Sequence, residues 1–258
     1  MKRRAGRGIG LALSGGAARG FAHIGVIKTL QENDIGVDYV TGTSVGSIVG
    51  ALLCGGYGWQ QMVDIAESLK WSELVSPTFS GMGLVSTKKL ESFVGELLGE
   101  VDFDELEIPF RAVAVDISRG EEVVFSSGSV ARAARASSSV PGIFEPLVDE
   151  DRALVDGGVV NNLPVSLARE MGARKVIAVD LNAQRGTTGP PVNLIDVTFR
   201  SFAMLLNATS MDGRDEADVL IQPDLDEFGY HDLSGSREMM ARGERAAAAH
   251  LKKLRRLR

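Results

Sequence analysis

The sequence contains a single cysteine among its 258 residues. Cys54 lies inside an apolar run, so an intramolecular disulfide is excluded and a reducing compartment is expected. No stretch approaches the roughly 20 consecutive apolar residues that a membrane-spanning helix needs. The basic start, Met1 to Arg4, precedes an apolar segment that is too short and too interrupted to indicate a signal peptide. Together these absences predict a cytoplasmic protein.

Basic residues are outnumbered by acidic ones. The 28 Lys and Arg residues against 34 Asp and Glu residues give a net charge of −6, which argues against general nucleic-acid binding. No metal-binding constellation is present, so neither a metal nor a cofactor is predicted. The sequence shows no internal repeat or linker, and it carries no prediction of an oligomeric state. We expect one domain over residues 1–258, with a core at about 8–182 and a C-terminal helical part at about 192–258.

The sequence does contain an alternation of strand-like and helix-like segments. Short apolar runs predict strands, whereas apolar residues spaced three or four apart predict helices. The predicted strands cover 9–13, 37–41, 110–115, 122–125, 153–155, 175–180 and 219–221. The predicted helices cover 21–32, 48–54, 62–69, 88–98, 130–137, 164–171, 192–210 and 236–258. Such alternation favours an α/β fold with a mostly parallel sheet covered on both faces.

The segment Gly42-Thr43-Ser44-Val45-Gly46 lies between a predicted strand and a predicted helix. A serine in such a turn has the layout of a nucleophile elbow, in which the flanking glycines permit a tight turn. The N-terminus of the following helix would place free N–H groups near the reacting oxygen. Ser44 is therefore the candidate nucleophile.

A glycine-rich turn, Ser14 to Gly20, follows the first predicted strand. Backbone N–H groups that converge in such a turn suit a phosphate or a developing oxyanion. Its spacing matches neither the dinucleotide fingerprint nor the P-loop. A plain structural turn and an anion- or nucleotide-binding module stay open as alternatives.

Asp156 leaves a predicted strand and is followed by two glycines, Gly157 and Gly158. Its carboxylate can point across the end of the sheet and act as the general base for a serine hydroxyl. With an ordinary pKa of about 3.9 an aspartate is a weak base at neutral pH, so this role requires a water-poor setting. Asp-Gly-Gly is also a common turn sequence, which is the alternative.

In this order, after successive strands, the three motifs resemble those of the patatin-like phospholipase family. The resemblance is reinforced by residues 11–26 (LALSGGAARGFAHIGV), 139–144 (SVPGIF) and 156–164 (DGGVVNNLP), and it extends over about residues 8–182. It implies a three-layer α/β/α fold. It also implies a serine acyl hydrolase that cleaves lipid acyl esters, as a phospholipase A or a lysophospholipase-type esterase does, without a cofactor.

The resemblance also implies roles for individual residues. Ser44 is the nucleophile and Asp156 the base of a Ser–Asp dyad. Ala17 stands where many relatives have a third glycine, which is acceptable at negative φ but distorts the oxyanion hole at positive φ. The residues implied around the dyad are the oxyanion-hole amides of Gly15, Gly16 and Ala17, and the supporting residues Arg19, Gly20, Gly42, Gly46 and Gly157.

The implied chemistry is two-step acyl transfer through an acyl-serine, which water activated by the same aspartate then hydrolyses. An acyl chain needs an apolar slot. The loop from Ser76 to Val85 carries Phe79, Met82 and Leu84, and it is predicted to supply part of the slot and to form a lid. A loop that packs these side chains onto the domain is the alternative.

Histidines allow a rival mechanism. The order Ser44, Asp156, His231 is that of an α/β-hydrolase triad. His23 is predicted to bond to neighbouring backbone, and His250 to be solvated. A catalytically idle relative that acts as a regulatory adaptor is a further alternative.

The segment from Leu251 to Arg258 (LKKLRRLR) is basic in an otherwise acidic chain. We predict a solvated helix end whose cations complement the helix dipole. The alternative is a peripheral membrane contact, with the cations on anionic headgroups and the leucines toward the bilayer.

Overall fold

The computed structural model describes residues 8–183, 190–231 and 233–257. Its strands are β1 (Ile9–Leu13), β2 (Tyr39–Thr43), β3 (Ser76–Pro77), β4 (Val85–Ser86), β5 (Phe110–Asp116), β6 (Glu121–Phe125), β7 (Leu147–Asp149), β8 (Arg152–Asp156), β9 (Lys175–Val179) and β10 (Val219–Ile221). Its α-helices are α1 (Phe21–Glu32), α2 (Val45–Cys54), α3 (Trp59–Ser68), α4 (Trp71–Leu74), α5 (Lys88–Leu98), α6 (Val130–Ser137), α7 (Val165–Glu170), α8 (Leu194–Thr209), α9 (Met211–Glu216), α10 (Ser236–Ala249) and α11 (Leu251–Leu254). Short 3-10 helices are η1 (Ala17–Gly20), η2 (Phe103–Glu105), η3 (Gly157–Val159) and η4 (Arg255–Leu257).

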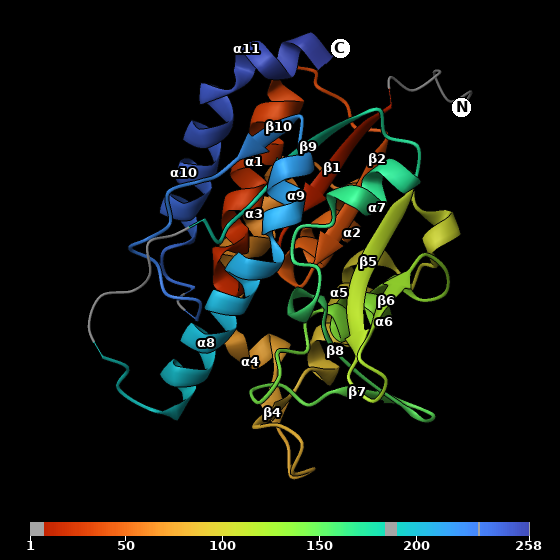
Figure 1. Cartoon of the computed structure of the whole chain (residues 1–258), viewed down its shortest axis with the longest axis vertical. Coiled ribbons are helices and arrows are strands. Elements are labelled where there is room, and N and C mark those ends of the chain that lie inside the picture. The colour runs from red at the N-terminus through yellow and green to blue at the C-terminus, as the bar shows by residue number, and fades with distance from the viewer. Residues whose placement is uncertain (1–7, 184–189, 232, 258) are drawn as a thin grey trace.

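The main sheet has the strand order β10-β9-β1-β2-β5-β8-β7, and β6 pairs with β5 as well (Figure 1). The five strands from β10 to β5 are parallel, whereas β6, β7 and β8 are antiparallel to their neighbours. The predicted mostly parallel α/β sheet is thus confirmed at its centre, and it becomes mixed toward one edge.

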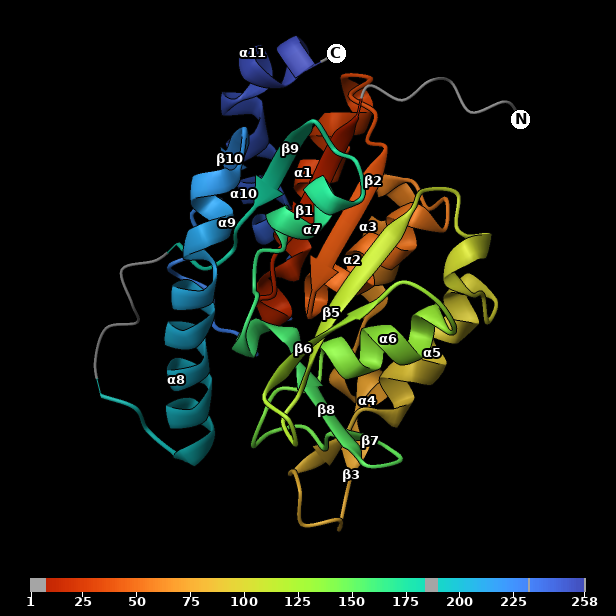
Figure 2. The same cartoon turned by 45° about the vertical axis from the view of Figure 1, so that its right-hand side comes forward.

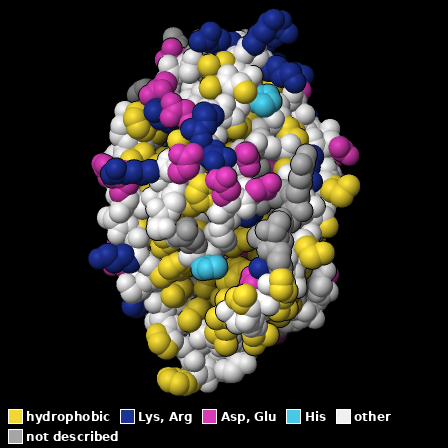
Figure 3. Space-filling view, turned by 90° about the vertical axis from the view of Figure 1, so that its left-hand side faces the viewer, with side chains coloured by type: hydrophobic (Ala, Val, Ile, Leu, Met, Phe, Trp, Pro, Cys, Tyr) yellow, Lys and Arg dark blue, Asp and Glu magenta, His cyan; other side chains and the backbone are white. Residues whose placement is uncertain are grey.

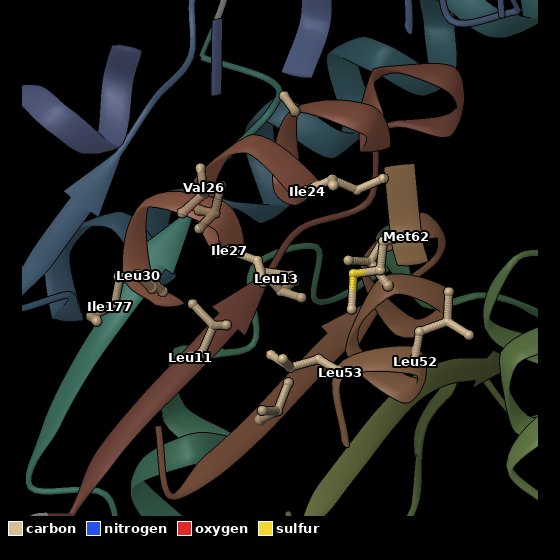
Figure 4. Packing of buried hydrophobic residues seen from close by; sticks show 14 of the residues in the cluster. Leu11, Leu13, Ile24, Val26, Ile27, Leu30, Leu52, Leu53, Met62 and Ile177 are labelled. Carbon is tan, nitrogen blue, oxygen red and sulfur yellow. The ribbon is translucent and has the colours of Figure 1, made fainter. Parts of the chain in front are cut away.

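Helices cover both faces of this sheet, which gives three layers (Figure 2). Because neighbouring side chains of a strand point to opposite faces, β1 contributes to two cores. Leu11 and Leu13 pack with α1, α2 and α3, as Figure 4 shows, and α10 closes the same core. Ala12 points the other way, toward α7. The predicted three-layer α/β/α architecture is confirmed.

The terminal helix α10 packs on α1 with almost no space between the two backbones. A Cβ on Gly25 of α1 would lie 1.9 Å from the Met240 carbonyl oxygen, and one on Gly243 would lie 2.0 Å from that of Ala22. Glycine is required at this crossing because any side chain would push the helices apart. The C-terminal part of the chain therefore belongs to the same core as β1.

The structure differs from the prediction at the C-terminal end and in several short elements. The predicted helix over 236–258 is interrupted at His250, between α10 and α11, and Leu254 of α11 is buried against the core. The suggestion that the leucines of this segment face a bilayer is therefore wrong. The short strands β3, β4 and β7 were missed because two or three residues show too little alternation to be recognised. Within the part of the chain that the structure describes, no helix is both long and apolar enough to cross a membrane.

Candidate active site

The register of the sheet brings Ser44 and Asp156 together. Strand β2 ends with Thr43 paired to Val113 of β5, and Ser44 follows at once. Strand β8 runs in the opposite direction and ends with Asp156 paired to Ala114, the next residue of β5. The two strands therefore meet end to end along β5, so the candidate nucleophile and the candidate base leave the sheet at the same point.

Ser44 occupies a strained elbow between β2 and α2. Its φ of 54° and ψ of −127° lie in a region that residues other than glycine rarely adopt. A Cβ on Gly42 would lie 2.4 Å from the Gly46 carbonyl oxygen, and one on Gly46 would lie 2.3 Å from that of Leu13. The elbow can be this tight only because both flanking residues are glycines.

Asp156 is fully buried at the end of β8. Its Oδ1 accepts a hydrogen bond from the Gly158 N–H at 2.8 Å, whereas no described residue donates to its Oδ2 within hydrogen-bonding geometry. Burial raises the pKa of Asp156 to about 7, and the nearby Ser44 hydroxyl and the Gly158 N–H partly offset this rise. The site therefore supplies the water-poor setting that an aspartate base requires.

The glycine-rich turn packs directly against the nucleophile, since a Cβ on Gly15 would lie 2.9 Å from the Ser44 Cβ. The Gly15 N–H already donates to Asn162 Oδ1 at 3.0 Å, so it does not fit the predicted role as an oxyanion donor. The N–H groups of Gly16 and Ala17 have no acceptor among the described residues. The candidate oxyanion donors thus narrow to these two amides.

Ala17 takes a positive φ of 48°, which is the conformation expected to distort the oxyanion hole. An alanine in the left-handed region is strained by roughly 1 kcal/mol relative to glycine. The turn thus stores strain beside the strained elbow of Ser44, and the Ala17 N–H has no acceptor in the part of the chain that the structure describes.

The predicted supporting residues lie around this centre. Arg19 is buried, and its Nε and Nη2 donate to the Phe228 carbonyl oxygen at 2.9 and 2.7 Å. Its guanidinium lies 3.9 Å from the centre of the Tyr230 ring, and burial lowers its pKa. A Cβ on Gly20 would lie 2.1 Å from Val45, and one on Gly157 would lie 2.3 Å from the Val113 carbonyl oxygen. Arg19 thus holds the C-terminal segment, and the two glycines permit close packing.

Two buried asparagines were not recognised from the sequence. Asn162 reaches Gly15 with its Oδ1 and Ser210 Oγ with its Nδ2, at 3.0 and 2.8 Å. Asn182 donates from its Nδ2 to the Gly15 carbonyl oxygen at 2.6 Å. Asn162 lies in the segment 156–164, which begins with Asp-Gly-Gly. Asn182 follows β9 at the end of the sheet where the parallel strands β1 and β2 also end. Polar residues after parallel strands were the available signal.

No histidine completes a triad among the described residues. His23 Nε2 lies 2.9 Å from the Ser14 carbonyl oxygen, and burial lowers its pKa to about 4. His250 Nδ1 lies 2.9 Å from the Ala246 carbonyl oxygen. The exposed ring of His231 lies 6.2 Å from that of Phe199. The predicted backbone bond of His23 is confirmed, and His231 does not contact the dyad residues.

An apolar cavity opens beside Ser44 and Ala17. It runs between η1, α1, α2, α3, α4 and α5, and its walls include Ile24, Leu52 and Met62. The predicted contribution of Phe79 to this cavity is wrong, because the Phe79 side chain is fully exposed and lies outside the lining. The same exposure excludes the alternative in which it packs onto the domain.

Comparison with known proteins identifies the family of this chain. Residues 11–169 match the model of the patatin-like phospholipase family, so the chain belongs to that family of lipid ester hydrolases. It is 35% identical over 190 residues to the neuropathy target esterase sws of Drosophila melanogaster. The matched region covers 70% of this chain and 13% of that protein. It is 36% identical over 188 residues to the lysophospholipase NTE1 of Mycosarcoma maydis, covering 70% and 10%.

A bacterial relative and two solved structures extend the comparison. An uncharacterized NTE family protein of Mycobacterium bovis is 36% identical over 177 residues, which cover 67% of this chain and 49% of that protein. The chain therefore spans half or less of the length of these relatives. VipD from Legionella pneumophila superposes with a TM-score of 0.68 over 97% of this chain and 67% of VipD, at 15% identity. The type III effector ExoU superposes with a TM-score of 0.55 over 96% and 53%, also at 15% identity. At this identity the two structures show a shared fold.

Proposed function

We propose that the chain is a serine acyl hydrolase that uses a Ser44–Asp156 dyad to cleave lipid acyl esters. The observation that carries this proposal is the end-to-end meeting of a strained serine elbow with a buried carboxyl group whose pKa is about 7. A general base works best when its pKa lies near the working pH. The esterase and lysophospholipase relatives support the same class of reaction.

In the proposed reaction, Asp156 Oδ2 accepts the Ser44 proton while Ser44 Oγ attacks the ester carbonyl carbon. The N–H groups of Gly16 and Ala17 stabilise the negative charge that develops on the carbonyl oxygen. The bond to the alcohol then breaks, and the alcohol leaves with the proton held by Asp156. Water next attacks the acyl-serine and gives a proton to Asp156, which returns it to Ser44 as the fatty acid leaves.

The cavity supports a substrate with an acyl chain. Apart from Ser44, the side chains that line it are apolar with the exception of Thr87 and Ser138. A charged headgroup would lose its hydration there without compensation. The acyl chain therefore enters the cavity, and the polar part of the lipid stays at its mouth, as in a phospholipid or a lysophospholipid.

Fluorophosphonate labelling tests the proposal, because the reagent reacts with activated serines. Wild type is expected to gain one adduct, located on Ser44 by intact mass and peptide mapping. Ser44→Ala should remain folded and gain none, while Ser80→Ala, which removes an exposed serine, should label like wild type. A folded wild type without an adduct would instead support the regulatory-adaptor alternative.

A membrane contact would use a different surface from the basic C-terminal end. Val75 and Thr87 both line the cavity, and the hairpin β3–β4 is formed by the residues between these two positions. Its tip carries the fully exposed Phe79 and the half-exposed Met82. The hairpin is thus an apolar projection from the rim of the acyl cavity.

Helix α8 lies toward the same end of the molecule (Figure 1) and carries exposed apolar side chains. Leu194 and Met204 are 73% and 75% exposed. The inner side of α8 packs through Phe199 against Phe144, which also lines the cavity. Figure 3 shows hydrophobic side chains gathered on the lower half of this face, with charges of both signs on the upper half. A lipid surface fits this patch because the patch adjoins the cavity, whose lining includes Val75, Thr87 and Phe144.

Phe79→Asp is expected to weaken binding to mixed phosphatidylcholine–phosphatidylglycerol vesicles about tenfold or more, since it replaces a buried aromatic ring by a charge in the bound state. Co-sedimentation measures the binding. The double variant Lys252→Glu, Lys253→Glu alters the basic end and should bind like wild type. Unchanged binding of Phe79→Asp, or loss of binding in the double variant, would contradict this assignment of the surface.

A further inference from the structure

Buried side chains hold both backbone polar groups of Gly15. Its N–H donates to Asn162 Oδ1 at 3.0 Å, and its carbonyl oxygen accepts from Asn182 Nδ2 at 2.6 Å and from Ser14 Oγ at 3.1 Å. That carbonyl belongs to the same planar peptide group as the Gly16 N–H. In a trans peptide the two point in opposite directions, so fixing the carbonyl also aims the Gly16 N–H.

Asn182 is in turn oriented by two further contacts. Its Oδ1 accepts from the Tyr230 hydroxyl at 3.1 Å, and its backbone N–H donates to Asp180 Oδ1 at 3.0 Å. The side chain is 2% exposed, so water does not compete for these bonds. A hydroxyl that donates to Oδ1 leaves Nδ2 to face the Gly15 carbonyl, which fixes the orientation of the amide.

Tyr230 itself is bound to the glycine-rich turn. Its carbonyl oxygen accepts from the Ala18 N–H at 3.0 Å, and its ring lies under the Arg19 guanidinium. The segment after β10 therefore contacts the turn directly through the backbone and ring of Tyr230, and its hydroxyl reaches the turn through Asn182. None of these contacts uses the N–H groups of Gly16 and Ala17, which have no acceptor among the described residues.

Asn182 and Tyr230 lie beyond the residues that match the family model, which end at 169. We propose that Asn182, oriented by Tyr230, is a positioning residue that aims and polarises the Gly16 N–H for the oxyanion. The inference rests on the proposed acyl hydrolase function. A hydrogen bond to the carbonyl of a peptide strengthens its N–H as a donor, so the effect grows as charge develops in the transition state. Tyr230, in the last quarter of the chain, thereby acts on the site through Asn182.

The test compares Asn182→Ala and Tyr230→Phe with wild type on a p-nitrophenyl ester of a medium-chain fatty acid. Asn182→Ala is expected to lower kcat about 10- to 100-fold and Tyr230→Phe about 3- to 10-fold, with KM nearly unchanged, because the oxyanion exists only in the transition state. The acid limb of the pH profile should stay in place, since neither change touches Asp156. Tyr57→Phe is the matched control: it removes a hydroxyl that donates to the Leu97 carbonyl oxygen, away from the turn.

Two ligands separate positioning from a merely structural role. An alkyl trifluoromethyl ketone forms an oxyanion when Ser44 adds to it, whereas a primary alcohol of the same chain length occupies the cavity without one. We expect the variants to lose affinity for the ketone in proportion to kcat and to keep their affinity for the alcohol. Equal losses for both ligands would show a damaged cavity and overturn the inference.

Labelling of the same proteins distinguishes the two levels of failure. A wild type without a Ser44 adduct would overturn the proposed function and this inference together. A labelled, active wild type with wild-type kcat in Asn182→Ala would overturn the inference alone. If Asn182→Ala does not fold, Tyr230→Phe decides, because it keeps the ring beneath Arg19 and removes only the hydroxyl; wild-type kcat in that variant would then overturn the inference.

Discussion

Replacing Asp156 with asparagine is expected to abolish acyl transfer by Ser44 and, at the same time, to stabilise the fold. The amide cannot accept the serine proton, so kcat/KM should fall by about 10⁴-fold. Its Oδ1 can still accept from the Gly158 N–H, so the local structure is retained. Ester hydrolysis and thermal unfolding of the same two proteins measure both effects.

The stabilisation follows from the raised pKa of the buried carboxyl group. Burial raises the pKa of Asp156 from its ordinary value of 3.8 to about 7, which corresponds to up to about 4 kcal/mol. Because the folded-state pKa is raised, burial of Asp156 costs the wild type no stability below about pH 4. The free energy of unfolding then falls by this amount as the pH rises to about 7. The advantage of Asp156→Asn should therefore grow between these values and then level off. The wild-type kcat/KM should rise over the same approach to pH 7, about tenfold per pH unit, because activity requires the charged form.

Asp116→Asn is the matched control for Asp156→Asn. Asp156 pairs with Ala114 at one end of the β5–β8 ladder, and Asp116 pairs with Leu154 at the other end. Asp116 is also almost fully buried, but there the effect of burial is outweighed by hydrogen bonds from Ser118 and by Arg119, so its pKa is lowered. Removing its charge should destabilise the fold at neutral pH, which is the opposite sign. A destabilised Asp156→Asn, or one that still labels at the wild-type rate, would contradict the proposed role of the buried carboxyl group.

The sequence was sufficient to single out Ser44 and Asp156 as candidates because each lies in a short motif with a local backbone requirement. Their meeting, however, depends on β8 running antiparallel to β5 and ending one pair beyond β2, and no local pattern encodes that register. The same limit explains Asn182. Its partner Gly15 is brought near by the pairing of β1 with β9, so only the folded sheet shows which carbonyl the amide meets.

Amphipathic patterns predicted secondary structure better than they predicted partners. The apolar residues of the C-terminal segment are regularly spaced, but Leu254 packs into the core instead of facing a lipid. In the hairpin β3–β4 the opposite holds, since Phe79 extends into solvent. Burying an apolar side chain is favourable in either setting, so a pattern cannot say whether the protein core or another surface covers it.

Ser44→Gly is expected to be as inactive as Ser44→Ala but more stable. At φ 54° and ψ −127° a residue with a Cβ is strained by about 1–3 kcal/mol, whereas glycine adopts this region without penalty. Glycine also makes the unfolded chain more flexible, which offsets about 0.4–1 kcal/mol of that gain. The net difference of about 1 kcal/mol should raise the unfolding midpoint of Ser44→Gly some 2–4 °C above that of Ser44→Ala. Thermal unfolding of the two inactive variants measures it.

Ser47 provides the matched comparison three residues further along α2, where the backbone is helical. Its hydroxyl donates to the Ser44 carbonyl oxygen, and both Ser47→Gly and Ser47→Ala remove that bond. In a helix glycine is less stable than alanine by about 1 kcal/mol, so the order of the two variants should reverse. If alanine were the more stable residue at both positions, the elbow would carry no strain. If the order reverses as expected, the chain retains at Ser44, as at Asp156, a residue that weakens the fold because the proposed chemistry needs it.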